Sequence, residues 1–568
     1  MARGHEVTQS YAFIEALGHI LRAKDAETVD SALRIIRNGR ATISDKYWAR
    51  KTMERLSRSV ETKDAFRIER NNVAYNSPHF DGTVEGALRA VEKREECVFY
   101  DFLASKELER VARVSPDVLG ISVCDERQLI PGLILGSLVR DRLTQIKVIL
   151  GGNLWARLAH AFHLPGFAEL LRRTCDGIVQ AEGFLPMDAL TQGSHPADVP
   201  GLVWRDKGGV VVNRNQTTPV NFNDLPSPIF LDGVRQWAPE KVVPLYTSSN
   251  CEKRCGFCAI SAGSDTFLVR QRVMDAKHVA RDMIASGAHR FDFTDELLSV
   301  VRQIEIGKEL RMAGHDATWQ CYLTVTRDLL DLARCQELAN AGCRAVQLGL
   351  ESLDPETLTR EKKGWNGPEG YGTILRNLRF VGIQTHVFII LGIPGERTEV
   401  TLQWPAFLKK HGNDITTIKS SRYRLTRMSP EETFLSHGRD PMTTRDMRHL
   451  ALIELQPDTQ PLKLNRQFHY RPESDISNKR VDALRDLMEE ACRRHWGYEI
   501  TSTLPWWANR GHYTAKELEA MSRELPPPDH VDLESAWPKI RTMIRESPDA
   551  KLIPDNGGLS FESLEGGI

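Results

Sequence analysis

Cys251-Glu252-Lys253-Arg254-Cys255-Gly256-Phe257-Cys258 decides the fold, and it directly follows an apolar, strand-like run. Three thiolates at this spacing can bind three irons of a four-iron cluster, whereas an electron-transfer cluster usually takes four cysteines. The fourth iron would then be open to the amino and carboxylate groups of S-adenosylmethionine, which predicts radical chemistry. A zinc knuckle, or a cluster with a distant fourth cysteine, has the same local signature.

The other cysteines are scattered through apolar patterns, so we expect each to be a small buried hydrophobic residue rather than a ligand. No second clustered set exists in the sequence, and we therefore predict a single cluster. These residues are Cys97, Cys124, Cys175, Cys321, Cys335, Cys343 and Cys492.

Composition narrows the class of protein. A chain of 568 residues with 75 basic and 76 acidic side chains predicts two to four domains and no nucleic-acid partner. No apolar run reaches the length of a membrane span, and the first residues lack the apolar core of a signal peptide. Because cluster thiolates require reducing conditions, we expect a cytoplasmic protein with no membrane partner.

Short apolar strands alternate with helical patterns in the middle of the chain. This alternation is typical of a parallel sheet with crossover helices, and six such units predict a partial (β/α)6 barrel. Ligand sites of such sheets lie at the carboxyl ends of the strands, where the cysteine run also falls. The expected strands are 242–248, 290–296, 318–324, 345–352, 385–392 and 418–425, and the expected helices are 274–286, 300–313, 328–341, 371–381 and 399–411.

Polar residues close several of these strands. Thr294-Asp295-Glu296, Glu351-Ser352 and the Gly392 to Glu396 segment each end a predicted strand, and Gln320 and Tyr322 lie within another. Each could simply cap a helix or form a tight turn. Their repeated placement at successive strand ends favours a shared binding site.

Residues 242–430 resemble the core of the radical S-adenosylmethionine superfamily. The resemblance rests on the three cysteines, with Phe257 before the last of them, and on the strand-end segments. It implies that Asp295 or Glu296 contacts the methionine amino group and that Glu351 or Ser352 binds the ribose or methionine moiety. It also implies that the backbone near Gly392 approaches adenine and that Lys362, or the adjacent Lys363, pairs with the methionine carboxylate.

The amino-terminal half carries a second alternating pattern, which predicts a doubly wound, Rossmann-like sheet. Small residues end its later strands, and glycine lets a backbone approach a bulky ligand closely. The expected strands are 72–75, 97–102, 118–123, 147–151 and 177–181, and the expected helices are 86–93, 106–114, 130–143 and 156–173.

This half closely resembles the cobalamin-binding domain fused to many radical S-adenosylmethionine enzymes. The resemblance rests on the segments around residues 116–122, 148–152 and 181–183. It implies that cobalamin is held without a histidine ligand, because Ser77 stands where a histidine-donating loop has an aspartate before His79. The residues implied to contact cobalamin are Ser122, Gly151, Gly152, Glu182 and Gly183.

Together these resemblances imply an enzyme that uses a [4Fe-4S] cluster, S-adenosylmethionine and cobalamin. The expected reaction is methylation of an unactivated carbon in a small-molecule or peptide substrate, with flavodoxin or ferredoxin as electron donor. Non-radical methylation, ring formation or rearrangement, and a non-enzymatic iron–sulfur or zinc protein remain as alternatives. The predicted regions are a helical region at 1–70, a cobalamin-binding domain at 71–200, a bridge at 201–241, a radical barrel at 242–430, an α-rich substrate or lid domain at 431–550 and a disordered tail at 551–568.

Overall fold

The larger sheet has six parallel strands and follows the chain almost in order. The computed structural model describes residues 5–38, 43–69, 72–180, 182–214, 220–229, 242–260, 272–365, 367–401, 403–437 and 460–462. The strand order is β15-β14-β13-β12-β11-β8, so each strand pairs with its neighbour in sequence. The strands are β8 Val242–Leu245, β11 Arg290–Phe293, β12 Thr318–Leu323, β13 Cys343–Glu351, β14 Gln384–Leu391 and β15 Thr417–Arg422.

Parallel neighbours require crossover connections, and helices supply them along the outer face of this sheet. A single apolar core, with Phe291, Trp319 and Leu348 among its buried members, joins the helices to the strands. All six predicted strands and the predicted helices at 274–286, 300–313 and 371–381 are confirmed, with ends displaced by a few residues. The helix predicted at 328–341 is divided into η6 Arg327–Leu330 and α14, and the helix predicted at 399–411 into α17 Thr398–Thr401 and α18. The helices are α12 Ala276–Ala285, α13 Val300–Met312, α14 Leu332–Ala341, α16 Tyr371–Phe380 and α18 Trp404–His411.

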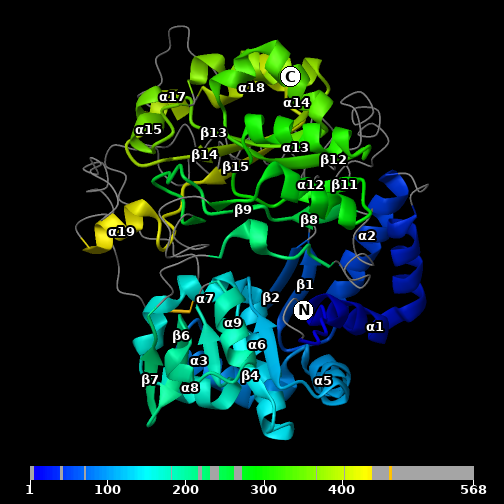
Figure 1. Cartoon of the computed structure of the whole chain (residues 1–568), viewed down its shortest axis with the longest axis vertical. Helices are drawn as coiled ribbons and strands as arrows, with labels where there is room; N and C mark the ends of the chain where they lie inside the picture. The colour runs from blue at the N-terminus through cyan, green and yellow to red at the C-terminus, as the bar shows by residue number, and fades with distance from the viewer. Residues whose placement is uncertain are drawn as a thin grey trace, which may run out of the picture.

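The smaller sheet has five strands in the order β3-β4-β5-β6-β7, of which the first three are parallel. Between its first two strands runs α6 Glu126–Arg142, whose buried residues extend from Leu129 to Val139 without a break. Figure 1 shows this sheet and its helices beneath the larger sheet. The strands are β3 Val118–Ser122, β4 Lys147–Gly151, β5 Gly177–Val179, β6 Leu202–Asp206 and β7 Gly209–Val212.

Several predictions for this sheet are wrong. Strand β2 Asn72–Asn76 forms, but it pairs only with β1 Ala65–Glu69 in a separate antiparallel hairpin. The predicted strand at 97–102 is instead turn and helix, including α4 Tyr100–Phe102. The predicted helix at 156–173 is divided into α7 Asn153–Arg157, η3 Ala159–His163 and α8 Phe167–Thr174. Part of the predicted bridge is β6 and β7, which complete the sheet through antiparallel pairs.

The predicted amino-terminal helices are present as α1 Ala12–Arg37, which is kinked at Asp25, and α2 Ile43–Arg58. Among the helices that the structure describes, none has the length and apolar character needed to cross a membrane. The predicted carboxyl-terminal domain and tail lie outside the described residues, apart from α19 Pro430–His437 and residues 460–462. Leu462 is buried in the core of the smaller sheet, and its backbone N–H donates to Gly82 O at 2.9 Å.

Candidate active site

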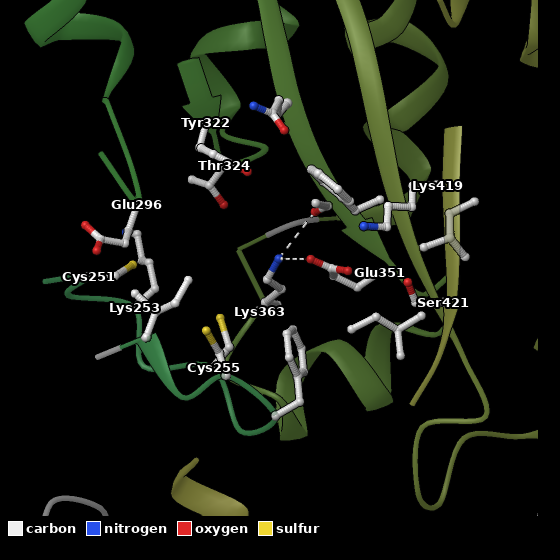
Figure 2. A pocket seen from close by; sticks show the side chains of 18 of the residues that line it. Cys251, Lys253, Cys255, Glu296, Tyr322, Thr324, Glu351, Lys363, Lys419 and Ser421 are labelled. Atoms are coloured by element: carbon white, nitrogen blue, oxygen red, sulfur yellow. Dashed lines mark hydrogen bonds and ion pairs between the residues drawn. The ribbon is translucent and has the colours of Figure 1, made fainter. Parts of the chain in front are cut away.

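A cavity of about 980 Å³ lies at the carboxyl ends of the larger sheet (Figure 2). Cys251, Cys255 and Cys258 all line it, so the fold brings the three predicted ligands to one place. Among the described residues that line it, these are the only thiols, and no histidine is present. The cavity therefore has room for a metal cluster together with a small molecule.

The cysteine loop is fixed by backbone hydrogen bonds. The N–H of Gly256 donates to Glu361 O at 3.2 Å, and the N–H of Cys258 donates to Cys255 O at 3.1 Å. Burial raises the pKa of the Cys255 thiol to about 12 and that of Cys258 to about 11. The thiols are therefore protonated without metal, and binding of iron must displace their protons.

A buried ion pair crosses the cavity between the end of β13 and the segment after α15 Pro355–Arg360. Lys363 Nζ donates to Glu351 Oε1 at 2.7 Å, and each residue is only 8% exposed. Burial lowers the pKa of Lys363, but the neighbouring Glu351 carboxylate outweighs it and the net pKa is raised. Of the two adjacent lysines, Lys363 lines the cavity, whereas Lys362 is absent from its lining.

The two acidic residues after β11 have different surroundings. Asp295 is fully buried and accepts hydrogen bonds from the backbone N–H and hydroxyl of Thr247, and from the Ser248 hydroxyl. Burial raises the pKa of Asp295 despite these bonds. Asp295 thus fastens the end of β11 to the residues after β8, while Glu296 lines the cavity beside Cys251 (Figure 2).

Ser352 and Gly392, two further predicted contacts of S-adenosylmethionine, are buried and do not line the cavity. The Ser352 hydroxyl donates to Glu396 and accepts from the N–H of Asp354 at 2.9 Å. Gly392 has φ of 73° in the turn after β14, a conformation that favours glycine. Burial raises the pKa of Glu396 to about 7, so this carboxyl group is partly protonated at neutral pH. The Ser352–Glu396 bond ties the ends of β13 and β14 together.

Sequence reasoning missed several lining residues on the inner face of the sheet. Phe388, Lys419 and Trp365 line the cavity, and Trp365 Nε1 donates to Thr324 Oγ1 at 3.0 Å. The signal was present for the first two, because alternate residues of a strand share a face. Phe388 and Lys419 are direct partners in the β14–β15 register.

The predicted cobalamin contacts lie at the carboxyl edge of the smaller sheet. Gly120 and Ser122 are exposed, and a Cβ at Gly151 would have no atom within 4 Å. Gly152 has φ of 100°, and a Cβ there would lie 2.3 Å from Val123 O. This edge is therefore bare backbone with open space above β4, which fits a large flat ligand.

One arginine links the smaller sheet to a short strand pair that begins just after β8, formed by β9 Ser248–Ser249 and β10. Arg272, in β10 Arg272–Val273, pairs with Glu182 at 2.8 Å just after β5. It also donates to Ser249 Oγ at 3.0 Å and to Val220 O at 2.9 Å. Glu182 therefore has a structural partner in the β9–β10 pair, and this ion pair joins the segment after β5 to the segment after β8.

His79 lies in the loop after β2, where its Nε2 contacts Glu96 Oε2 at 2.9 Å. Cys124 does not fit its prediction, because it is exposed at the end of β3 with its Sγ 3.4 Å from Ser122 Oγ. Cys97, Cys175, Cys321, Cys335 and Cys343 are buried as predicted, and Cys492 lies outside the described residues.

Residues 245–400 match the Radical SAM superfamily, so the chain contains a radical S-adenosylmethionine domain. Two methyltransferases of Chlorobaculum tepidum share part of this sequence. The bacteriochlorophyllide d C-12(1)-methyltransferase is 24% identical over 27% of this chain, and the C-8(2)-methyltransferase is 28% identical over 25%. Each match spans 34% of the relative's own length.

Solved structures extend the likeness to the fold of most of the chain. The radical S-adenosylmethionine methyltransferase TsrM from Kitasatospora setae has a TM-score of 0.52 and 18% identity, over 79% of this chain and 92% of TsrM. The cobalamin-dependent radical enzyme OxsB has a TM-score of 0.51 and 16% identity, over 85% of this chain and 74% of OxsB. The two sheets therefore follow the fold of these enzymes.

Proposed function

We propose that this protein is a cobalamin-dependent radical S-adenosylmethionine enzyme, most simply a methyltransferase that acts on an unactivated carbon. One observation carries the proposal: three thiols of a radical S-adenosylmethionine domain meet in a single cavity, and no fourth thiol or imidazole lies among its described lining residues. Such a set suits a [4Fe-4S] cluster with one iron left for S-adenosylmethionine. The cluster and S-adenosylmethionine together supply one-electron cleavage chemistry, and cobalamin supplies methyl transfer.

The side chains of the cavity have separate tasks in this proposal. Cys251, Cys255 and Cys258 hold the cluster, and Glu296, which lines the cavity beside Cys251, accepts a hydrogen bond from the methionine amino group. The Glu351–Lys363 pair holds a carboxylate and an ammonium at fixed positions in the cavity, where either can orient a polar part of the cofactor. The exposed backbone at Gly151 and Ser122 gives cobalamin a surface without bulky side chains to contact.

Methylation is favoured over the other reactions of this class by the relatives themselves. The two Chlorobaculum tepidum proteins are methyltransferases, and TsrM, whose fold this chain shares, is a methyltransferase as well. The zinc alternative is less well supported, because the described residues contain no group of three His, Cys, Asp or Glu side chains arranged around a single ion. A cytoplasmic location and an electron donor such as flavodoxin or ferredoxin belong to the same proposal.

The test is anaerobic reconstitution of the full chain with iron, sulfide, cobalamin and a reductant. We expect four-iron stoichiometry, a paramagnetic cluster signal that changes on addition of S-adenosylmethionine, and formation of 5′-deoxyadenosine and S-adenosylhomocysteine. S-adenosylhomocysteine without 5′-deoxyadenosine would instead indicate non-radical methylation. A cluster signal indifferent to S-adenosylmethionine, or zinc as the only bound metal, would refute the proposal.

A further inference from the structure

A lysine on the inner face of β15 has no charged partner among the described residues. Lys419 lines the cavity and is exposed there, and within the described part of the chain its ammonium makes no hydrogen bond or ion pair. The buried lysine of the cavity, Lys363, is neutralised by Glu351. A charged group that faces a cavity without a countercharge is expected to bind an anion.

The position of Lys419 separates it from the cysteine loop. Strands β15 and β8 are opposite edges of the larger sheet, and the cysteines follow β8. Figure 2 shows Lys419 across the cavity from Cys251 and Glu296, with the Glu351–Lys363 pair between them. An anion at Lys419 would therefore lie apart from the methionine group at the cluster.

Two aromatic side chains, Phe388 and Tyr322, line the same cavity as Lys419. Phe388 pairs directly with Lys419 in the β14–β15 register, and its ring is nearly parallel to that of Tyr322, with centroids 6.1 Å apart and an interplanar angle of 14°. Tyr322 is 41% exposed and lines the cavity, so its ring is accessible to a ligand. Flat rings of this kind favour a flat apolar ligand.

The charges of the cavity lining also favour a negatively charged ligand. Its described lining contains five basic side chains and two carboxylates, and one carboxylate, Glu351, is already paired. The basic residues are Lys253, Lys363, Lys419, Arg422 and Arg424. Such an excess attracts a negatively charged substrate. At its place on β15, beside Phe388 in the strand register, Lys419 offers one compact ammonium, and a carboxylate is an anion that one ammonium can pair with.

We propose that the substrate carries a flat ring and a carboxylate, with the carboxylate on Lys419 and the ring on Tyr322 and Phe388. This inference rests on the proposed function, because it assigns the substrate class of the same cavity. Lys419 then fixes the orientation of the ring, and so decides which carbon lies toward the cluster.

Calorimetric titration of the reconstituted full chain tests this assignment without turnover. The probes are 3-phenylpropionate and indole-3-propionate, each compared with its neutral primary amide. We expect the acids to bind roughly 10- to 100-fold more tightly than the amides, as for a hydrogen bond to a charged group. The preference should disappear in Lys419→Met and persist in Lys419→Arg. In Lys308→Met, which changes an exposed lysine on α13, it should equal that of the wild type.

A second variant separates the ring from the charge. Tyr322→Leu should weaken the acids and the amides by the same factor and leave the preference intact. Equal binding of acid and amide, an unchanged preference in Lys419→Met, or no binding of either acid at millimolar concentration would overturn the inference. The proposed function fails on a different readout, the absence of products from S-adenosylmethionine, so either can fail alone.

Discussion

The carboxyl edges of the two sheets present surfaces of different chemical character. The edge of the larger sheet projects side chains into a cavity: three thiols, the Glu351–Lys363 pair, and Lys419, which has no partner among the described residues. The edge of the smaller sheet offers exposed backbone at Gly120 and Gly151 and short side chains such as Ser122. The first edge is equipped for coordination and charge, and the second for contact with a large surface.

Because of this difference, a substitution should impair ligand binding at the two edges for different physical reasons. A cysteine or a buried ion pair contributes specific chemistry, so loss of one atom group is expected to be severe. An edge of glycines leaves room for a ligand to contact the backbone. Ligand binding there should therefore be weakened by a larger side chain rather than by the loss of a functional group. Substitutions at the two edges therefore distinguish these two kinds of failure.

Cys255→Ser should produce the largest effect. Iron content should fall from about four per chain toward none, and both products of S-adenosylmethionine should become undetectable, because a hydroxyl is a poor iron ligand. Iron and sulfide analysis with product chromatography measures this. Cys335→Ser is the matched control, because Cys335 is buried in the core and donates only to Leu329 O at 3.4 Å. Full iron content in Cys255→Ser would disprove cluster ligation by this thiol.

Glu351→Gln tests the buried charge of the same edge. It leaves the Lys363 ammonium buried without a countercharge, which should cost about 3–5 kcal/mol of unfolding free energy. Urea denaturation of the full chain measures the loss, and Glu351→Gln combined with Lys363→Met should recover a large part of it. A loss below about 1 kcal/mol would place this pair among weak, solvated ion pairs.

Gly151→Leu tests the bare edge of the smaller sheet. A leucine there projects into open space above β4 without disturbing the protein, but it should weaken cobalamin binding by roughly 10- to 100-fold, a typical overpacking penalty. Cobalamin absorbance retained after gel filtration measures this. Gly209→Leu on exposed β7 is the control, since a Cβ there meets only Asp206 O at 3.6 Å. Unchanged retention in Gly151→Leu would remove this edge from the binding site.

The sequence predicts the larger sheet well because its strands are short apolar runs separated by clear helices. It fails at residues 97–102, where Phe99, Phe102 and Leu103 follow helical spacing and are buried on one side. It also misses the β6–β7 hairpin, although Asp206-Lys207-Gly208-Gly209 is a turn sequence between two apolar segments. Both errors arise because tertiary burial decides what a short apolar run becomes.

For the site, residue type identifies the thiols and Glu351, but not which of two adjacent lysines faces inward. Lys362 has φ of 54°, and this turn directs Lys363 rather than Lys362 toward the cavity. Likewise Asp295 and Glu296 are equivalent in sequence, and only the hydrogen bonds from Thr247 and Ser248 distinguish the buried carboxylate from the lining one. Backbone direction after a strand end depends on packing, which a sequence pattern does not contain.

Asp292→Asn should have the smallest effect and tests a half-buried charge on β11 of the larger sheet. Burial raises the pKa of Asp292 to about 6, an effect that Gln320 on β12 opposes only in part. In the unfolded chain an Asp carboxyl has a pKa of about 3.9, so the folded state binds the proton of Asp292 more tightly than the unfolded state does.

As pH rises from about 4 to 6, the wild type therefore loses free energy of unfolding that the Asp292→Asn variant does not lose. After allowance for the partial exposure of this carboxylate, Asp292→Asn should be about 1–2 kcal/mol more stable at neutral pH. Its advantage should vanish near pH 4 in parallel urea titrations of the two proteins. A constant difference across this pH range would mean that Asp292 is not the group that titrates.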